Sequence, residues 1–258
     1  MKLVPVNGER LAGKGWRRLR NWSFAAKDAV LPLVGFEFAR VATTMPIAFI
    51  AHSGRYVPAA VMSPVKGRNL YVAASGQWLG SYVPAALRGY PFALVRVKDA
   101  EKLALCVDED SGLIVAADEA TEKFFEVDGS PSATVKTVIQ LLQEVEQNRA
   151  LTAMAVAALA EAGLIVPWPL TAKIGDQQVT PQGLHRVDEA KLNALDDAAF
   201  LKLRKSSALG LAYAHLISLP NAERFGQLAA LQQQLAPPPM PPPSELFTGD
   251  DGGTIRFD

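Results

Sequence analysis

Histidine and cysteine are the side chains most able to do recognisable chemistry in this sequence, and there are few of them. The histidines are His52, His185 and His215, and Cys106 is the single cysteine. A serine or cysteine nucleophile needs a nearby base, and the sequence contains no Gly-x-Ser-x-Gly elbow. The histidines also lack the short spacing of a zinc site. Cys106 lies in an apolar strand pattern over 103–107, which favours a buried, unreactive thiol over a reactive one.

His215 is the acid–base candidate of the sequence, with Asp188 or Glu189 as its partner. It shares a predicted helical face with Leu211 and Leu219. Two interpretations follow from that position. A histidine on an apolar helix face can be a hydrogen-bonded part of the core, or it can act as the acid or base of a pocket.

The densest carboxylate cluster consists of Asp108, Glu109 and Asp110. Carboxylate oxygens in a loop can hold Ca²⁺ or Mg²⁺, but the spacing is not that of an EF-hand and no second ligand segment accompanies it. A solvated turn at a strand end is the alternative interpretation. Asp250 and Asp251 are equally ambiguous. We therefore predict no metal site and no cofactor, and we keep Asp108, Glu109 and Asp110 as weak metal-ligand candidates.

The segment from Trp78 to Phe92 is the best candidate for a recognition surface. Trp78, Tyr82, Arg88 and Tyr90 combine aromatic rings with a guanidinium group, a mixture typical of interface hot spots and ligand pockets. The alternative is that the rings pin a short helix onto a sheet, because large aromatic side chains usually serve the core.

Charge does not point to nucleic acid or to a membrane surface. The 258 residues carry equal numbers of acidic and basic side chains, giving a formal net charge of +0. A basic and aromatic run occurs near the start and consists of Lys14, Trp16, Arg17, Arg18, Arg20 and Trp22. It could contact phosphates, but a solvated arm with two packed tryptophans is the simpler interpretation. We predict no nucleic-acid partner.

The sequence shows no targeting or membrane-spanning pattern. Residues 1–20 lack the continuous apolar run and the cleavage site of a signal peptide. No stretch approaches the roughly 18 apolar residues that cross a bilayer. One cysteine cannot form an internal disulfide, so no oxidising compartment is needed. We expect a cytoplasmic protein; the oligomeric state stays open.

Periodicity predicts an α+β fold in which the first half forms an antiparallel, meander-like sheet. A helix is expected over 31–44, with Glu37 and Arg40 on the side away from its apolar stripe. Strands and turns follow, with one short helix inserted at 78–87. The expected strands span residues 47–50, 57–62, 70–74, 92–97 and 103–107, the last two pairing as a hairpin.

The second half is predicted to be helical, with a small hairpin. Ser130 and Pro131 open a long helical pattern that continues to about residue 162. Because an unbroken helix of this length is unusual, two interpretations stay open: one continuous helix, or two helices with a break near Asn148. Strands over 170–174 and 178–180 flank a tight turn, and 184–187 is a third short strand. Helices follow in pieces, one capped by Asp196 and one opened by Pro220.

Composition divides the chain into four parts. Residues 1–30 are an N-terminal arm, and 31–235 are one α+β domain with a sub-boundary near 118–130. Residues 236–245 form a proline-rich linker that favours a stiff, extended conformation. The tail, 246–258, is expected to dock as an edge strand on its own sheet or on that of a partner.

Several sequence segments resemble members of the bacterial SapC family, in the expected order along nearly the whole chain. They are PLV (32–34), EFAR (37–40), PIAF (46–49), WLGSYVPA (78–85), RGYPFAL (88–94), LCVDEDS (105–111), RVDEAKLN (186–193), AYAHLISL (212–219) and DGGTIRF (251–257). The resemblance implies an association with surface-layer proteins and their export. Relatives tend to be encoded near flavin-dependent halogenase-like, cupin-like or dioxygenase-like proteins and outer-membrane receptors. It implies no catalytic residues, and it does not concern the membrane permease that shares the name.

These observations favour a non-catalytic binding or adaptor protein that holds a peptide, protein or small ligand for neighbouring enzymes or an export system. A protein or peptide partner is therefore expected. The alternatives are an enzyme with an unrecognised site, accessory to halogenase-like or dioxygenase-like chemistry, and a surface-layer-associated protein. A deep pocket with converging polar groups would favour an enzyme, whereas a shallow apolar groove would favour an adaptor.

Overall fold

The computed structural model describes residues 2–97 and 102–236. Antiparallel sheets dominate the first half and helices the second, so the predicted α+β class is confirmed. The predicted linker lies outside the described residues except for Ala236, and the predicted tail lies wholly outside them. Within the described ranges, no helix combines the length and the apolar character needed to cross a bilayer.

The largest sheet combines strands from both halves of the chain. Its order is β10-β13-β4-β5-β3, and neighbouring strands are antiparallel. The bounds are β3 Val30–Pro32, β4 Ile47–His52, β5 Arg55–Val61, β10 Ile165–Pro167 and β13 Leu184–Val187. The predicted strands at 47–50, 57–62 and 184–187 are confirmed. β4 and β5 meet at Ser53 and Gly54, which both adopt positive φ, as a two-residue hairpin turn requires.

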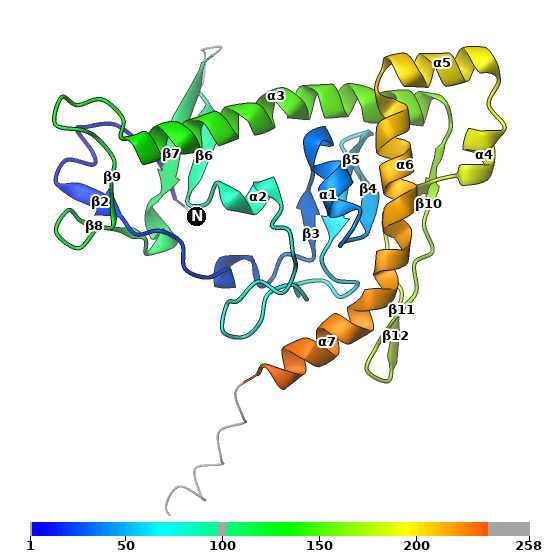
Figure 1. The fold of residues 1–258 in the computed structure, drawn as a ribbon, viewed down its shortest axis with the longest axis horizontal. Coiled ribbons are helices and arrows are strands. Elements are labelled where there is room, and N and C mark those ends of the chain that lie inside the picture. The colour runs from blue at the N-terminus through cyan, green and yellow to red at the C-terminus, as the bar shows by residue number, and fades with distance from the viewer. Residues whose placement is uncertain (1, 98–101, 237–258) are drawn as a thin grey trace, which may run out of the picture.

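Two three-stranded sheets lie at the other end of the molecule (Figure 1). Their orders are β1-β7-β6 and β8-β2-β9. The bounds are β1 Leu3–Pro5, β2 Lys14–Trp16, β6 Phe92–Arg96, β7 Leu103–Asp108, β8 Ile114–Ala116 and β9 Glu122–Lys123. The pairing of β6 with β7 confirms the predicted hairpin. Residues 3–5 and 14–16 are strands of these sheets rather than irregular chain, because each pairs with a strand from beyond residue 100.

Helix α3 (Ala133–Glu161) joins the two ends of the molecule. Its 29 residues span about 43 Å and run along one side of the fold (Figure 1). Val135 belongs to a second hydrophobic core, whereas Val156 and Leu159 belong to the main core. Of the two alternatives, the continuous helix is the one observed: α3 runs without a break at Asn148, and both of its ends are packed in a hydrophobic core.

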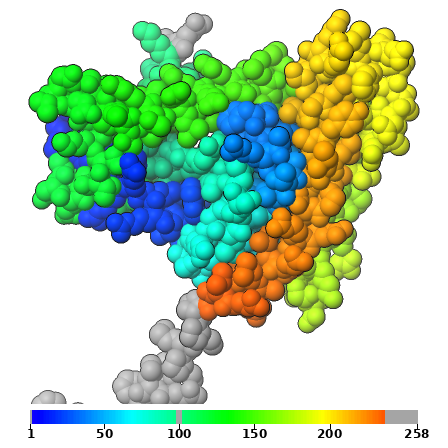
Figure 2. Space-filling model, in the orientation of Figure 1, coloured from blue at the N-terminus to red at the C-terminus, as the bar shows by residue number. Residues whose placement is uncertain are grey.

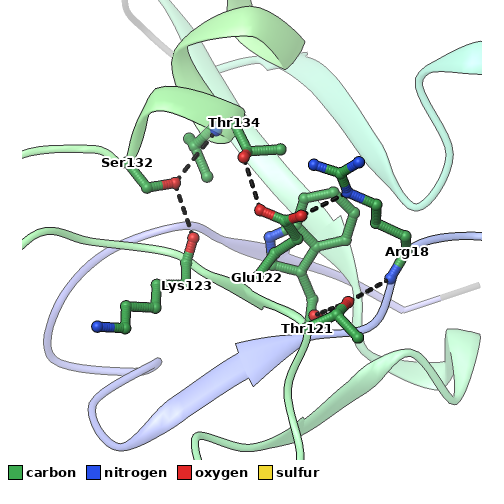
Figure 3. A network of polar contacts seen from close by, with 8 residues as sticks. Arg18, Thr121, Glu122, Lys123, Ser132 and Thr134 are labelled. Carbon is green, nitrogen blue, oxygen red and sulfur yellow. Dashed lines mark hydrogen bonds and ion pairs between the residues drawn. The ribbon is translucent and has the colours of Figure 1, made fainter.

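A polar network anchors the start of α3 on the small sheet β8-β2-β9 (Figure 3). Ser132, and not Ser130, is the cap: its Oγ accepts a hydrogen bond from the Val135 N–H (3.3 Å) and donates one to the Lys123 carbonyl (2.7 Å). The Thr134 hydroxyl donates to Glu122 at 2.6 Å, and Arg18 pairs with the same carboxylate. These contacts, the Thr134 hydrogen bond foremost, lower the pKa of Glu122.

Two of the predicted elements are much shorter than expected. The stretch predicted as a helix over 31–44 divides into β3, the 3₁₀ helix η2 (Gly35–Glu37) and helix α1 (Phe38–Val41). Its first residues enter the sheet, where the Leu33 N–H donates to the Pro58 carbonyl (2.9 Å).

The helix predicted over 78–87 is reduced to α2 (Ala85–Arg88). Pro84 disfavours helical geometry in the residue before it. The strand expected over 70–74 is reduced to a single bridge between Val72 and Trp78.

The second half follows its prediction more closely. The hairpin of β11 (Ala172–Ile174) and β12 (Gln177–Val179) is confirmed. The Asp196 carboxylate caps its helix by accepting from the Ala199 N–H (2.8 Å), and Pro220 lies in the first turn of a 3₁₀ helix. The helical pieces are α4 Glu189–Asn193, α5 Asp197–Lys205, α6 Ala208–Ser218, η4 Leu219–Arg224 and α7 Phe225–Gln234.

We expect the substitution Gly15→Ala to destabilise the small sheet. A Cβ atom at Gly15 would overlap the Ala120 side chain and lie 2.6 Å from the Glu122 carbonyl oxygen. Overpacking of this kind costs about 1–3 kcal/mol. Gly8→Ala is the matched control, since a Cβ there meets nothing within 4 Å. Urea unfolding of both variants measures the difference, and equal midpoints would contradict the close β2–β9 approach.

Candidate functional site

The structure brings three of the four predicted recognition residues into one cluster. The Trp78 Nε1–H donates to the Tyr82 carbonyl at 2.9 Å, and the Arg88 guanidinium donates to the Tyr82 hydroxyl at 3.3 Å. Arg88 also lies over the Tyr82 ring, 5.6 Å from its centre. Trp78 and Tyr82 are half-buried against the main core, while Arg88 is exposed.

A buried carboxylate, Glu37, organises this cluster. Only 1% of Glu37 is exposed. Its Oε1 accepts hydrogen bonds from the Tyr82 hydroxyl (2.9 Å) and the Ala85 N–H (2.6 Å), and its Oε2 accepts from the Val34 N–H (3.2 Å). Burial, and then the Glu37 carboxylate, raise the pKa of Tyr82 to about 12. Tyr82 is therefore a hydrogen-bond donor at neutral pH.

Sequence reasoning missed Glu37 because helical periodicity placed it on the polar side of a longer helix. The structure instead ends the strand at Pro32 and buries Glu37 at the end of the 3₁₀ turn η2, whose Phe36 stays exposed. A buried charge needs several donors, and these come from segments near residues 34, 82 and 85. The EFAR motif at 37–40 was the only signal in the sequence that pointed to this position.

Tyr90 belongs to an aromatic chain beside the Glu37 cluster. Its ring stacks on Phe24, with centres 3.9 Å apart and planes at 9°. Phe24 contacts Trp22, whose ring meets Trp78 at 6.0 Å. These contacts fix the segment around residue 22 onto the predicted recognition segment. Most of the aromatic surface is consequently used in internal packing, as the second interpretation of the sequence expects.

An open apolar groove lies next to this cluster, and we call it the α3–α6 groove. It has a volume of about 650 Å³ and is bounded by η2 and α1, by α3, and by the junction of α5 with α6. On the face shown in Figure 2, the segment around α1 lies between α3 and α6. The lining residues are Gly35, Phe38, Ala39, Asn148, Leu151, Thr152, Met154, Ala155, Lys205, Ser206, Ser207, Gly210, Leu211 and Ala214.

Apolar side chains on two helices remain open to solvent at the groove. Leu151 is 60% exposed and Met154 is 61% exposed. Ile217, one turn beyond Ala214 on α6, is 67% exposed and extends the apolar surface. Lys205 is the one charged residue among those that line the groove. The arrangement suits an apolar ligand that carries a negative group.

Thr152 connects the groove to the Glu37 cluster. Its hydroxyl accepts a hydrogen bond from the Gly35 N–H (2.7 Å) and donates one to the Asn148 carbonyl (2.6 Å). Gly35 and Glu37 are the two ends of η2, which forms a groove wall. On the other side of Thr152 lies a smaller pocket of about 180 Å³ that includes Glu37 and Arg149. The cluster thus positions the wall of the groove.

His215 lies in the main core, and its side chain makes no hydrogen bond to Asp188 or Glu189. It is fully buried, and its Nε2 accepts a hydrogen bond from the Val187 N–H (3.1 Å). Burial lowers its pKa to about 4. The Asp188 carboxylate caps α4 by accepting from the Lys191 N–H (3.1 Å), and Glu189 is exposed. His215 is therefore neutral at pH 7, with its acceptor nitrogen already occupied.

The acidic cluster ties the N-terminal strand to β7. Asp108 accepts from the Lys2 N–H (2.8 Å) and the Asp110 N–H (3.3 Å). Glu109 pairs with Lys2 (2.8 Å) and Arg10 (3.2 Å). In the part of the chain that the structure describes, no three His, Cys, Asp or Glu side chains are grouped so that they could hold a metal ion.

Two further predicted features are accounted for by the fold: Cys106 by burial and the basic run by internal ion pairs. Cys106 is 6% exposed, and burial raises the pKa of its thiol. In the basic run near the start, Arg17 pairs with Glu119 at 2.6 Å and Arg18 pairs with Glu122. Both arginines are thus neutralised within the fold.

Comparison with known proteins gives one match. The SapC family model matches residues 6–225 of the chain. No curated protein and no solved structure matches it.

We expect Tyr82→Phe to destabilise the protein by about 1–3 kcal/mol, because the buried Glu37 carboxylate loses a donor. Glu37→Gln in the same background should reduce the penalty, since a neutral amide needs fewer donors. Tyr213→Phe is the control: Tyr213 is 42% exposed, and its hydroxyl has no hydrogen-bond partner among the described residues. A double-mutant cycle in urea measures the coupling, and additive effects would refute it.

Acid should weaken the fold through His215. The unfolded chain takes up this proton near pH 6.5, whereas the folded chain takes it up only near its lowered pKa of about 4. The free energy of unfolding therefore falls between these pH values, by at most about 1.4 kcal/mol per pH unit for one proton. Urea titrations should show a shallower slope for His215→Gln than for the parent protein. His52→Gln, at an exposed position, is the control for the loss of a histidine elsewhere on the chain. Equal slopes of unfolding free energy against pH for the parent protein and both variants would contradict the assignment of the acid effect to His215.

Proposed function

The chain belongs to the SapC family, and we propose that it is a non-catalytic binding or adaptor protein that holds a peptide segment of a partner protein. The segment occupies the α3–α6 groove. It is helical, with an apolar stripe and an acidic residue near Lys205. A short helix packed in an apolar groove is a common mode of peptide recognition.

The observation that carries this proposal is the exposure of Leu151 and Met154 beside the buried floor of Phe38 and Leu211. Exposed apolar side chains that adjoin a concave apolar surface mark protein-interaction sites. Helices α3 and α6 are fixed by the main core. The groove is therefore rigid, and a partner loses little free energy in ordering it.

Charge at the groove defines the partner further. Lys205 is in the last turn of α5 and follows Arg204, and both side chains are exposed. Within the described ranges, neither has an ion-pair partner. Lys202, in contrast, pairs with Glu161 at 3.1 Å. A carboxylate on the partner would complement Lys205 and fix the direction in which the segment lies.

The predicted recognition residues support this site in two ways. Tyr82 holds Glu37, which positions η2 against α3, and Trp78 packs behind Tyr82. Arg88 is exposed and offers a second contact to a partner that extends beyond the groove, and the half-buried Tyr90 lies near it in the chain.

No comparable observation favours the enzyme alternative. Its acid–base candidate, His215, is fully buried, the Asp188 carboxylate caps α4, and Glu189 is exposed. The surface-layer alternative rests on the family resemblance alone. The adaptor proposal has a defined surface, which makes it the one to test.

The test is capture from an extract of the native host with the tagged full-length chain, followed by titration of each captured protein. We expect a Leu151→Asp/Met154→Asp variant to bind that protein at least about tenfold more weakly, because truncation of a central apolar contact costs more than about 1 kcal/mol. Val127→Asp is the control, since Val127 is 104% exposed and lies outside the groove.

Three results would count against the proposal: no captured protein, equal loss with Val127→Asp, or undiminished binding to the groove variant. An Arg88→Ala variant, titrated in parallel, measures how much the second contact contributes to the affinity for the captured protein. Circular dichroism and urea midpoints must match between variants, so that a loss of binding is not a loss of fold.

A further inference from the structure

The C-terminal segment of the chain has the chemistry that the α3–α6 groove favours. Residues 244–258, outside the described ranges, contain the apolar residues Leu246, Phe247, Ile255 and Phe257. The same segment has four acidic residues, Glu245, Asp250, Asp251 and Asp258, against the single basic residue Arg256. Apolar and acidic groups thus alternate along the segment. They complement the exposed apolar side chains of the groove and Lys205, which has no ion pair to a described residue.

The chain is long enough to place this segment in the groove of its own molecule. From Ala214 in the groove to Ala236, the helical path along α6, η4 and α7 cannot exceed about 40 Å. Residues 237–243 are proline apart from Met240, and such a sequence spans about 22 Å when extended. Residues 244–257 add up to about 46 Å. The reach of Phe257 therefore exceeds the distance to the groove.

We propose that residues 244–258 dock in the α3–α6 groove of the same chain and compete there with the partner segment. This inference rests on the proposed function, since it makes the tail an internal occupant of the same site. Tethering gives the tail a local concentration in the millimolar range. A partner must then displace the tail, and only a segment with better apolar and acidic complementarity does so.

Carbodiimide cross-linking of the full-length chain tests the docking directly, because the reagent joins a lysine amine to a carboxylate that touches it. We expect an amide between Lys205 and one of the tail carboxylates, detected by peptide mass spectrometry. The Lys202–Glu161 pair, 3.1 Å apart, is the internal positive control. A mixture of ¹⁴N- and ¹⁵N-labelled protein separates links within one chain from links between two chains.

The tail variants Leu246→Ser/Phe247→Ser and Ile255→Ser/Phe257→Ser keep every charge and leave the described core untouched. At least one of them should lower the yield of the Lys205 link about fivefold or more. If the link arose from random collisions of a charged tail, its yield would be the same in both variants. The same variant should bind the captured partner more tightly, because its competitor has been weakened.

Several outcomes would overturn the inference. They are a Lys202–Glu161 link without a Lys205–tail link, a Lys205 link in which mixed-isotope pairs appear at the share expected for random pairing of two chains, and a link that is insensitive to both tail variants. Tail links to Lys173 on β11 instead would place the tail at a sheet edge. If the groove variant loses the partner but no Lys205–tail link forms, the proposed function stands and this inference fails. If the link forms but the affinity for the captured partner is the same in the Leu151→Asp/Met154→Asp variant, the proposed function fails. The groove is then a site for the tail alone.

Discussion

The packing of one continuous helix in two separate hydrophobic cores is the constraint on which the rest of this structure depends. Helix α3 contributes Val135 to the second core and Leu159 to the main core. Because a helix of 29 residues is stiff along its axis, it fixes the spacing of the two cores. Its capping network at Ser132 and its contacts with Gly35 then position sheets at one end and the groove at the other.

The buried Glu37 carboxylate is the second organising element. A charge removed from water is tolerated only where donors replace its hydration. Here the donors are a tyrosine hydroxyl and two backbone N–H groups from separate segments. The carboxylate therefore acts as a cross-link between η2 and the segment around α2. This cross-link joins the predicted recognition residues to the groove wall, although few of them face solvent.

The groove differs from the other candidate sites in what its residues leave unsatisfied. The acidic cluster at Asp108 has partners within the fold that account for its position. His215 is fully buried and uses its Nε2 to accept from the Val187 N–H, while its Nδ1 has no hydrogen-bond partner among the described residues. Leu151 and Met154, in contrast, expose apolar surface that neighbouring helices do not cover. Lys205 likewise projects from α5 without an ion pair to a described residue. A ligand or a segment of the chain that supplies both kinds of group gains free energy from each.

The sequence by itself determined the elements whose signals are local. The hairpins at β4–β5, β6–β7 and β11–β12, the long helix α3 and the cap at Asp196 all follow from alternation, helical periodicity and capping side chains, and the SapC family follows from ordered motifs. Only the tertiary structure decided the pairing of β13 with β4, the burial of Glu37 and the assembly of the α3–α6 groove. Each of these depends on segments about 50 to 180 residues apart. Periodicity reports which side of an element is apolar, but it does not report which distant segment covers that side. Glu37 was therefore expected on the polar side of a helix, although its donors bury it. The helical pattern likewise did not show that the packing of α6 leaves Leu151 and Met154 uncovered.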